Sequence, residues 1–94
     1  RQVEPLPDDR VVARHFMLLQ VEDKAGVLAK ITRVFGDHGV SLESVVQQPN
    51  VKHPDAEIVI ITHEASRASI ARVLADFESL GAVRAVKSVY RVEG

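Results

Sequence analysis

The segment VEDKAGVL, from Val21 to Leu28, contains residues that could bind a small charged molecule. Asp23 and Gly26 lie between an apolar stretch and the start of an amphipathic pattern. The first turn of a helix leaves backbone N–H groups without acceptors, and the helix dipole favours an anion there. Gly26 allows a turn with positive φ and the close approach of another molecule. The segment therefore predicts a site for an anionic group such as a carboxylate. A local interpretation stays open, in which Asp23 only caps the helix.

The remaining polar residues predict neither catalysis nor metal binding. The chain has four histidines, which fall on four different predicted elements: His15, His38, His53 and His63. The stretch HEASR has Arg67 where the zinc motif H-E-x-x-H needs its second histidine. The absence of cysteine excludes disulfides, thiol catalysis and cysteine-ligated zinc. We expect no catalytic residue and no metal ligand in this chain.

Composition narrows the class of protein further. The chain has 94 residues and a net charge of -1, with 46% hydrophobic and 27% charged residues, as expected for one globular domain. Its basic residues are scattered, which argues against nucleic-acid binding. No apolar run is long enough to cross a membrane, and no signal-peptide pattern is present. We expect a cytoplasmic protein.

Hydrophobic periodicity predicts elements in the order β-α-β-β-α-β. Apolar residues alternate in the strand stretches and recur at helical spacing in the helix stretches. Ser66 is expected to cap the second helix, and Gly39 and Gly81 to end the two helices. The expected strands are 13–21, 40–48, 56–62 and 82–92, and the expected helices are 26–39 and 66–80.

Two β-α-β halves predict an α+β, ferredoxin-like fold, with two helices on one face of a four-stranded antiparallel sheet. Right-handed crossovers favour the strand order 4-1-3-2, counted along the chain. The strand at 40–48 then lies at an edge, and pairing with a twofold copy would cover it. In the last strand we expect Val86, Tyr90 and Val92 on one face, with Lys87 and Arg91 on the other.

The first residues differ from the rest of the chain. RQVEPLPDDR is rich in proline and charge and has no apolar periodicity. We expect residues 1–11 to be a linker from a preceding catalytic part, and residues 12–94 to be the domain.

The stretch VEDKAGVLAKITRVFGDHGVSLESV resembles the signature of the ACT domain, a regulatory module that commonly binds amino acids. That signature is D-x-P-G-V-L, a helix, and then G-[VI]-[SN]-[IL]. The segments AEIVIITHEAS and VKSVYRVEG resemble the C-terminal ACT domain of bacterial homoserine dehydrogenase, so the resemblance covers about Ala13 to Gly94. Ala25 stands where the family usually has proline. The more flexible loop should weaken ligand binding by about 0.5–1 kcal/mol through its entropy.

The resemblance implies a dimer formed side by side through the edge strand and the first helix, with an effector at the interface. The backbone N–H groups of residues 26–28 would hold the effector's carboxylate. Asp23 would bind its ammonium or a side-chain hydroxyl, and Ser41 of the other copy would add a hydrogen bond. The implied ligand-binding residues are Asp23, Lys24, Ala25, Gly26, Val27 and Leu28 from one copy, and Gly39, Val40 and Ser41 from the other.

In homoserine dehydrogenase, the implied effector is L-threonine. The resemblance implies an allosteric sensor without activity or cofactor of its own, with NAD(P) bound by the preceding catalytic part. Two alternatives stay open. The chain could be a dimerisation module that needs no ligand, or the ACT domain of another enzyme, such as aspartate kinase, phosphoglycerate dehydrogenase or the stringent-response synthetase/hydrolase.

Overall fold

The computed structural model describes residues 12–49 and 54–92. The linker expected at residues 1–11 lies outside this part of the chain. The described elements, in chain order, are β1 (Val12–Val21), α1 (Val27–Asp37), β2 (Leu42–Pro49), β3 (Ala56–Thr62), β4 (Ala65–Ser66), α2 (Arg67–Ser79) and β5 (Val83–Val92).

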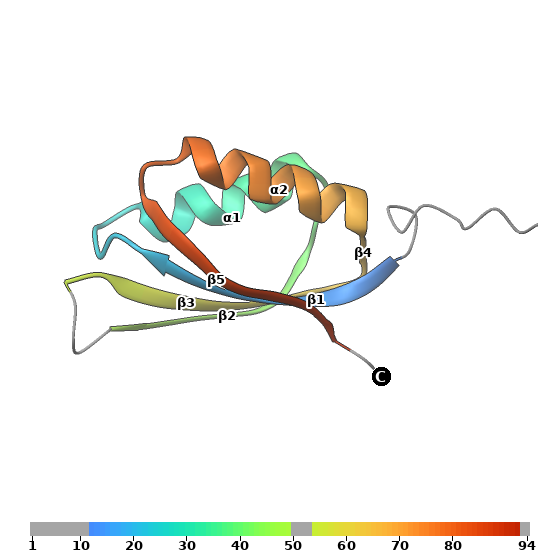
Figure 1. The fold of residues 1–94 in the computed structure, drawn as a ribbon, viewed down its shortest axis with the longest axis horizontal. Coiled ribbons are helices and arrows are strands. Elements are labelled where there is room, and N and C mark those ends of the chain that lie inside the picture. The colour runs from blue at the N-terminus through green and yellow to red at the C-terminus, as the bar shows by residue number, and fades with distance from the viewer. Residues whose placement is uncertain (1–11, 50–53, 93–94) are drawn as a thin grey trace, which may run out of the picture.

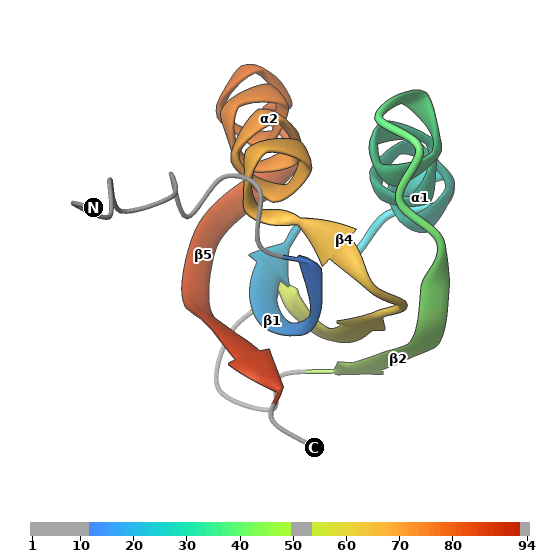
Figure 2. The same cartoon turned by 90° about the vertical axis from the view of Figure 1, so that its right-hand side faces the viewer.

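One antiparallel sheet forms the base of the fold, and both helices lie on the same face of it (Figure 1). β1 pairs with β3 on one side and with β5 on the other, and β3 pairs with β2. α2 lies over β5 and β1, while α1 lies toward β2 (Figure 2). This arrangement confirms the ferredoxin-like fold and the expected order of the four main strands.

A short fifth strand, β4, was not predicted from the sequence. Its two residues pair with the start of β1, where Ala65 faces Ala13 and Ser66 faces Val12. Two residues are too few to show an alternating pattern, so no local signal marks this strand. Ser66 also caps α2 as expected, because its Oγ accepts a hydrogen bond of 3.1 Å from the N–H of Ser69.

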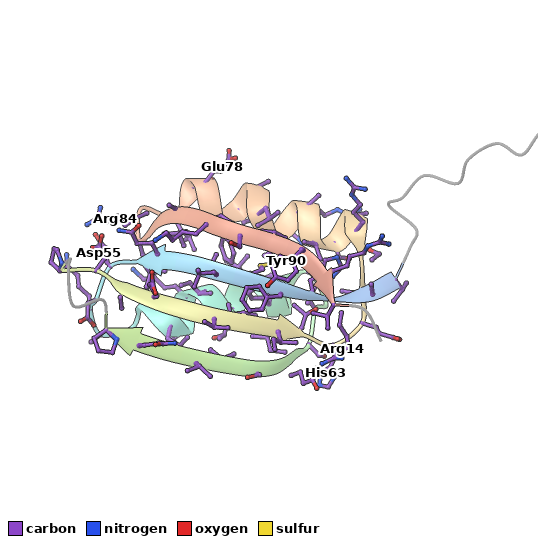
Figure 3. The ribbon with its side chains drawn as sticks, turned by 60° about the horizontal axis from the view of Figure 1, so that its bottom comes forward. Arg14, Asp55, His63, Glu78, Arg84 and Tyr90 are labelled. Atoms are coloured by element: carbon purple, nitrogen blue, oxygen red, sulfur yellow. The ribbon has the colours of Figure 1, made fainter. Side chains whose placement is uncertain are left out.

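The expected alternation of β5 is wrong around Lys87. Ser88 pairs with Leu18 and Val86 pairs with Leu19, so Lys87 is an extra residue in a bulge. Because paired residues share a face, Val86 lies on the same face as Leu19, toward the helices. Tyr90 lies on the opposite, helix-free face (Figure 3), where its ring stacks on Phe16 with a centroid distance of 4.8 Å. A bulge depends on pairing with a distant strand, so alternation along β5 alone could not predict it.

The core lies between the sheet and the two helices. Its strand residues are those that the alternation of β1 and β3 turns inward, and its helix residues form the expected apolar stripes. Edge-to-face packing of Phe35 and Phe77, with ring centroids 5.6 Å apart, joins α1 to α2. No described helix is long and apolar enough to cross a membrane. The most buried core side chains are Phe35, Phe77, Met17, Leu19, Ile31, Ile58, Ile60, Val21 and Val73.

The C-terminal end of α1 is fixed by His38 and Gly39. His38 is the C-cap residue, one position before the glycine that was expected to end the helix, and its Nε2 lies 2.7 Å from Oδ2 of Asp76 on α2. Gly39 follows with φ of 72°, a left-handed conformation that glycine adopts without strain. These contacts tie the end of α1 to α2 and turn the chain toward β2.

His15 on β1 is one of two buried polar residues of the described core, and only 5% of it is exposed. Its backbone N–H donates to Oγ1 of Thr62 at 3.0 Å, while its Nδ1 is buried without a hydrogen-bond partner among the described residues. Burial lowers the pKa of His15, the charge of Arg91 lowers it further, and the backbone of Ala13 partly opposes both.

The lowered pKa predicts how His15 changes stability with pH. The unfolded chain, with a histidine pKa of about 6.5, takes up this proton more readily than the folded chain. The contribution of neutral His15 to the free energy of unfolding should therefore be complete above about pH 7.5. It should be lost as the pH falls through about 6.5 toward the lower pKa of the folded state. Urea unfolding of wild type and His15→Gln at both ends of that range measures it.

The exposed His63 provides the control variant. His63→Gln should lose as much stability on acidification as wild type, whereas His15→Gln should lose less. Equal losses of stability in wild type and His15→Gln on acidification would contradict the lowered pKa of His15.

Candidate functional site

The turn before α1 has the open geometry that its sequence predicts. Gly26 has φ of 86° and ψ of -11°, and no side chain caps the helix. Asp23 is exposed and makes no hydrogen bond or ion pair with the described residues. The interpretation in which Asp23 caps α1 is therefore wrong, because a glycine in the left-handed region takes the cap position instead. The carboxylate of Asp23 stays available for an external group.

Backbone donors at the start of α1 are partly used. The N–H of Val27 donates to the carbonyl of Lys24 at 3.3 Å, and the N–H of Lys30 donates to the carbonyl of Gly26 at 3.1 Å. Among the described residues, the N–H groups of Leu28 and Ala29 have no backbone acceptor. Such unpaired donors at a helix start can bind a carboxylate.

Side chains of the expected ligand-binding set separate into exposed and buried members. Lys24, Ala25 and Gly26 are exposed beside Asp23. A Cβ placed on Gly26 would meet nothing within 4 Å, so the space above the turn is open. Val27 is 3% exposed and belongs to the core, and Leu28 packs against the core. The side chains of these two residues anchor the turn, and only their backbone can face a ligand.

The second part of the expected set lies between α1 and β2. Gly39 and Ser41 are exposed, while Val40 is 4% exposed and packs in the core. The carbonyl of Ser41 accepts a hydrogen bond of 2.9 Å from the N–H of His63, which fixes the backbone at the start of β2. The side chain of Ser41 is exposed at this point.

One copy of the chain does not bring the two parts together. They lie at opposite ends of α1, whose 11 residues span about 16 Å. The structure therefore separates the expected ligand-binding set into two half-sites, which are the turn at Gly26 and the segment at Ser41.

An ionic network that the sequence analysis missed holds the turn in place. The N–H of Glu22 donates to the carbonyl of Ala82 at 2.8 Å, and its carboxylate lies 3.1 Å from Nη2 of Arg84. Nε of Arg84 also lies 3.6 Å from Oδ1 of Asp55. Oδ2 of Asp55 accepts a hydrogen bond of 3.0 Å from Nε2 of Gln20. Arg84 and Asp55 lie at the same end of the sheet (Figure 3). These partners are distant in sequence, so only the strand register relates them.

β2 lies at the edge of the described sheet, as expected. Val46 and most of the later part of the strand are exposed. Glu43 lies within the register shift between Leu42 and Ser44. Its Oε1 lies 2.7 Å from Nη2 of Arg14 on β1. An exposed edge strand presents unpaired backbone groups that another strand can use.

Comparison with known proteins identifies the class to which this fold and turn belong. The ACT domain family model matches residues 15–82, and the chain belongs to that family. The chain is also similar to two homoserine dehydrogenases. It is 44% identical to that of Bacillus subtilis (strain 168) over 89 residues, which are 94% of this chain and 20% of the relative. It is 38% identical to that of Synechocystis sp. over 93 residues, 97% of this chain and 20% of the relative.

Solved structures give the same result. A homoserine dehydrogenase from Thiobacillus denitrificans aligns with a TM-score of 0.82 and 28% identity, over 94% of this chain and 19% of that chain. The ACT domain from GTP pyrophosphokinase of Chlorobium tepidum aligns with a TM-score of 0.59 and 17% identity, over 87% of this chain and 100% of that chain, which shows a shared fold. The chain spans about a fifth of the length of the homoserine dehydrogenases that it matches.

Two glycine variants test the conformation of the turn. Gly26→Ala should destabilise the fold by about 1–2 kcal/mol, because an L-residue is strained in the left-handed region. Gly36→Ala lies inside α1, meets nothing within 4 Å, and should stabilise the fold by about 0.5–1 kcal/mol. Urea unfolding measures both changes, and equal effects of the two variants would contradict the assigned geometry.

Proposed function

We propose that this chain is an amino-acid-sensing ACT domain that regulates a homoserine dehydrogenase, with L-threonine as the effector. The observation that carries the proposal is the open turn, where Gly26 caps α1 and Asp23 has no partner within residues 12–49 and 54–92. Membership of the ACT family and similarity to homoserine dehydrogenases support the assignment to such an enzyme.

Each end of an amino acid finds a complementary group at the proposed site. The ligand carboxylate accepts hydrogen bonds from backbone N–H groups at the start of α1, with those of Leu28 and Ala29 the freest. Asp23 pairs with the ligand ammonium or accepts from its hydroxyl. Ser41 of a second copy completes the site, because the Ser41 of the same copy lies at the far end of α1.

Regulation follows if the ligand favours one arrangement of two copies. A threonine bound between copies stabilises the arrangement that brings the half-sites together, and a coupling of about 1–3 kcal/mol suffices to control an attached enzyme. The exposed edge of β2 and the neighbouring α1 form the proposed dimer interface. The domain itself has no catalytic role, and the rest of the cytoplasmic parent enzyme binds NAD(P).

A dimerisation module without a ligand is the second candidate, and Ala25 favours it. This exposed residue stands where most ACT domains have proline, so the turn is less rigid before binding. The two candidates differ in one measurement, which is the response of the dimer to amino acids.

Calorimetric titration with threonine, serine, isoleucine and methionine tests the sensor. Threonine should bind, and Gly26→Asp should abolish binding, because its carboxylate occupies the open space and repels that of the ligand. Gly36→Ala, on the same helix, provides the control and should bind as wild type does. A dimer that responds to none of the four amino acids would leave only the dimerisation module.

Mixing two defective variants tests whether the site is shared between copies. Asp23→Ala and Ser41→Ala should each bind threonine more weakly than wild type. For Asp23→Ala the affinity should fall about tenfold, because a charged partner is lost. After unfolding and refolding together, each mixed dimer should contain one site with both residues intact and one with neither. Recovery of tight binding with half the sites of a wild-type dimer is expected in that mixed dimer, and its absence would contradict a shared site.

A further inference from the structure

The face of the sheet that the helices leave uncovered, here called the open face, carries mostly apolar side chains. Strand pairing assigns them to it, because paired residues share a face and successive residues alternate between faces. All of them are at least partly exposed, and Val46 and Tyr90 are 49% and 57% exposed. Figure 3 views the sheet from this side, with the helices behind the strands. The apolar residues of the open face are Phe16, Leu18, Val46, Val59, Ile61, Tyr90 and Val92.

This composition differs from that of a sheet with one face in water. An antiparallel sheet covered on one side normally alternates apolar residues with polar residues that face solvent. In β1 every residue from Phe16 to Leu19 is apolar, and in β3 every residue from Ile58 to Ile61 is apolar. Strands that are apolar on both faces are typical of sheets covered on both sides. The open face therefore has the composition of an interface.

Charged side chains border the apolar centre at both ends of the strands, and they pair with one another. At one end, Nη2 of Arg14 lies 2.7 Å from Oε1 of Glu43. At the other end, Nζ of Lys87 lies 3.4 Å from Oε2 of Glu57. Each pair is neutral, so two such faces can approach without repulsion between these groups. An apolar centre within a polar border is the usual anatomy of a protein–protein interface.

The area of the open face indicates how many copies meet. Four strands about 4.8 Å apart, paired over six residues from Phe16 to Val21 of β1, form a flat face of about 20 Å by 20 Å, or about 400 Å². Stable interfaces bury about 800 Å² on each partner, so the face of one copy is small for a stable contact. Two copies paired at β2, as in the proposed dimer, offer about 800 Å² together.

The symmetry of that dimer joins the two open faces. Antiparallel pairing of β2 with a second β2 places the twofold axis perpendicular to the sheet. This axis keeps the helices of both copies on one side and the two open faces on the other. The proposed dimer therefore has one continuous apolar face, and a second dimer has the same face.

We propose that the open face packs against the open face of a second copy, so that two β2-paired dimers stack into a tetramer with their helices outside. The contact removes Phe16, Val59 and Tyr90 from water, and the hydrophobic effect drives it. The strength of the contact rests on the proposed β2-paired dimer, whereas its formation needs no threonine.

Sedimentation equilibrium of the 94-residue chain, without added amino acid, tests the contact. Tyr90→Lys puts an unpaired charge into the contact and should weaken stacking at least about tenfold. Val86→Lys is the matched control, because Val86 is an exposed apolar residue of the same strand that lies on the helix side. At concentrations where wild type is stacked, Tyr90→Lys should have half the mass of wild type and Val86→Lys the same mass.

This ratio separates the proposal from the proposed dimer. If β2 pairing forms, Tyr90→Lys changes a tetramer into a dimer. If β2 pairing fails, the same variant changes a weaker face-to-face dimer into a monomer. The mass of Tyr90→Lys therefore reports on β2 pairing, and the twofold difference from wild type reports on the open face.

Val59→Lys provides a second variant, because Tyr90→Lys also removes the stacking of Tyr90 on Phe16. Val59 lies on β3, and its substitution leaves that ring pair intact. It should halve the mass as Tyr90→Lys does. Amide spectra at concentrations below stacking check the folding of each variant.

Two further measurements identify the force and the place of the contact. Because the border charges are paired within each copy, raising sodium chloride from about 0.1 M to 1 M should not weaken stacking. Dilution of wild type through the dissociation range should shift the methyl resonances of Leu18, Val59 and Ile61, while those of Ile70 on the helix side stay unchanged.

Several outcomes would overturn the proposal. Equal masses of wild type, Tyr90→Lys and Val59→Lys at all concentrations would show that this face does not bind a second copy. An equal loss of mass in Val86→Lys would show a general effect of added charge. Stacking that weakens tenfold in high salt would show an electrostatic contact elsewhere, and dilution shifts confined to β2 would leave only edge pairing.

Discussion

Pairing of β1 on both sides is the constraint on which the rest of the structure depends. With β3 on one edge and β5 on the other, β1 can neither shift nor turn without breaking both ladders. Its inward residues Met17, Leu19 and Val21 are therefore held beneath the two helices. The chain must leave this strand at Val21 and rise at once into α1, and Gly26 makes that change of direction in a left-handed conformation.

The same constraint explains why the turn is both fixed and available. Glu22 is anchored to Ala82 and Arg84, and Val27 is buried in the core, so the ends of the turn are held. Between these anchors, the residues around Asp23 and Gly26 are exposed and carry few internal hydrogen bonds. The anchored ends restrict the positions that the exposed backbone donors between them can take.

Sequence alone predicted the fold well because its main elements depend on local patterns. Alternation in β1 and β3 and the stripe from Val27 to Phe35 were enough to predict the layers and the strand order. β4 and the bulge at Lys87 escaped prediction because they exist only through pairing with β1. The exposed positions around Gly26 followed from residue type, whereas the capping role considered for Asp23 was wrong. The roles of the ligand-binding residues stay predictions.

Sequence also gave no indication that His15 and Arg91 are neighbours. That histidine lies among apolar residues of a strand, and Arg91 is far from it along the chain, so neither residue indicates the other as its partner. Their contact follows from the register of β1 and β5, which the bulge at Lys87 displaces by one residue. Without the bulge, a different residue of β5 would face His15.

The two outer strands of the sheet differ in how regular they are. β5 contains register shifts opposite Leu18–Leu19 and Gln20–Val21, whereas β2 pairs without interruption from Ser44 to Pro49. Bulges twist a strand and interrupt its row of backbone groups, so β5 is a poor template for a further strand. β2 is thus the better template for a further strand. In the proposed dimer, two copies that pair at β2 about a twofold axis would leave neither β2 edge free, so assembly through this edge would close as a pair instead of extending into a filament.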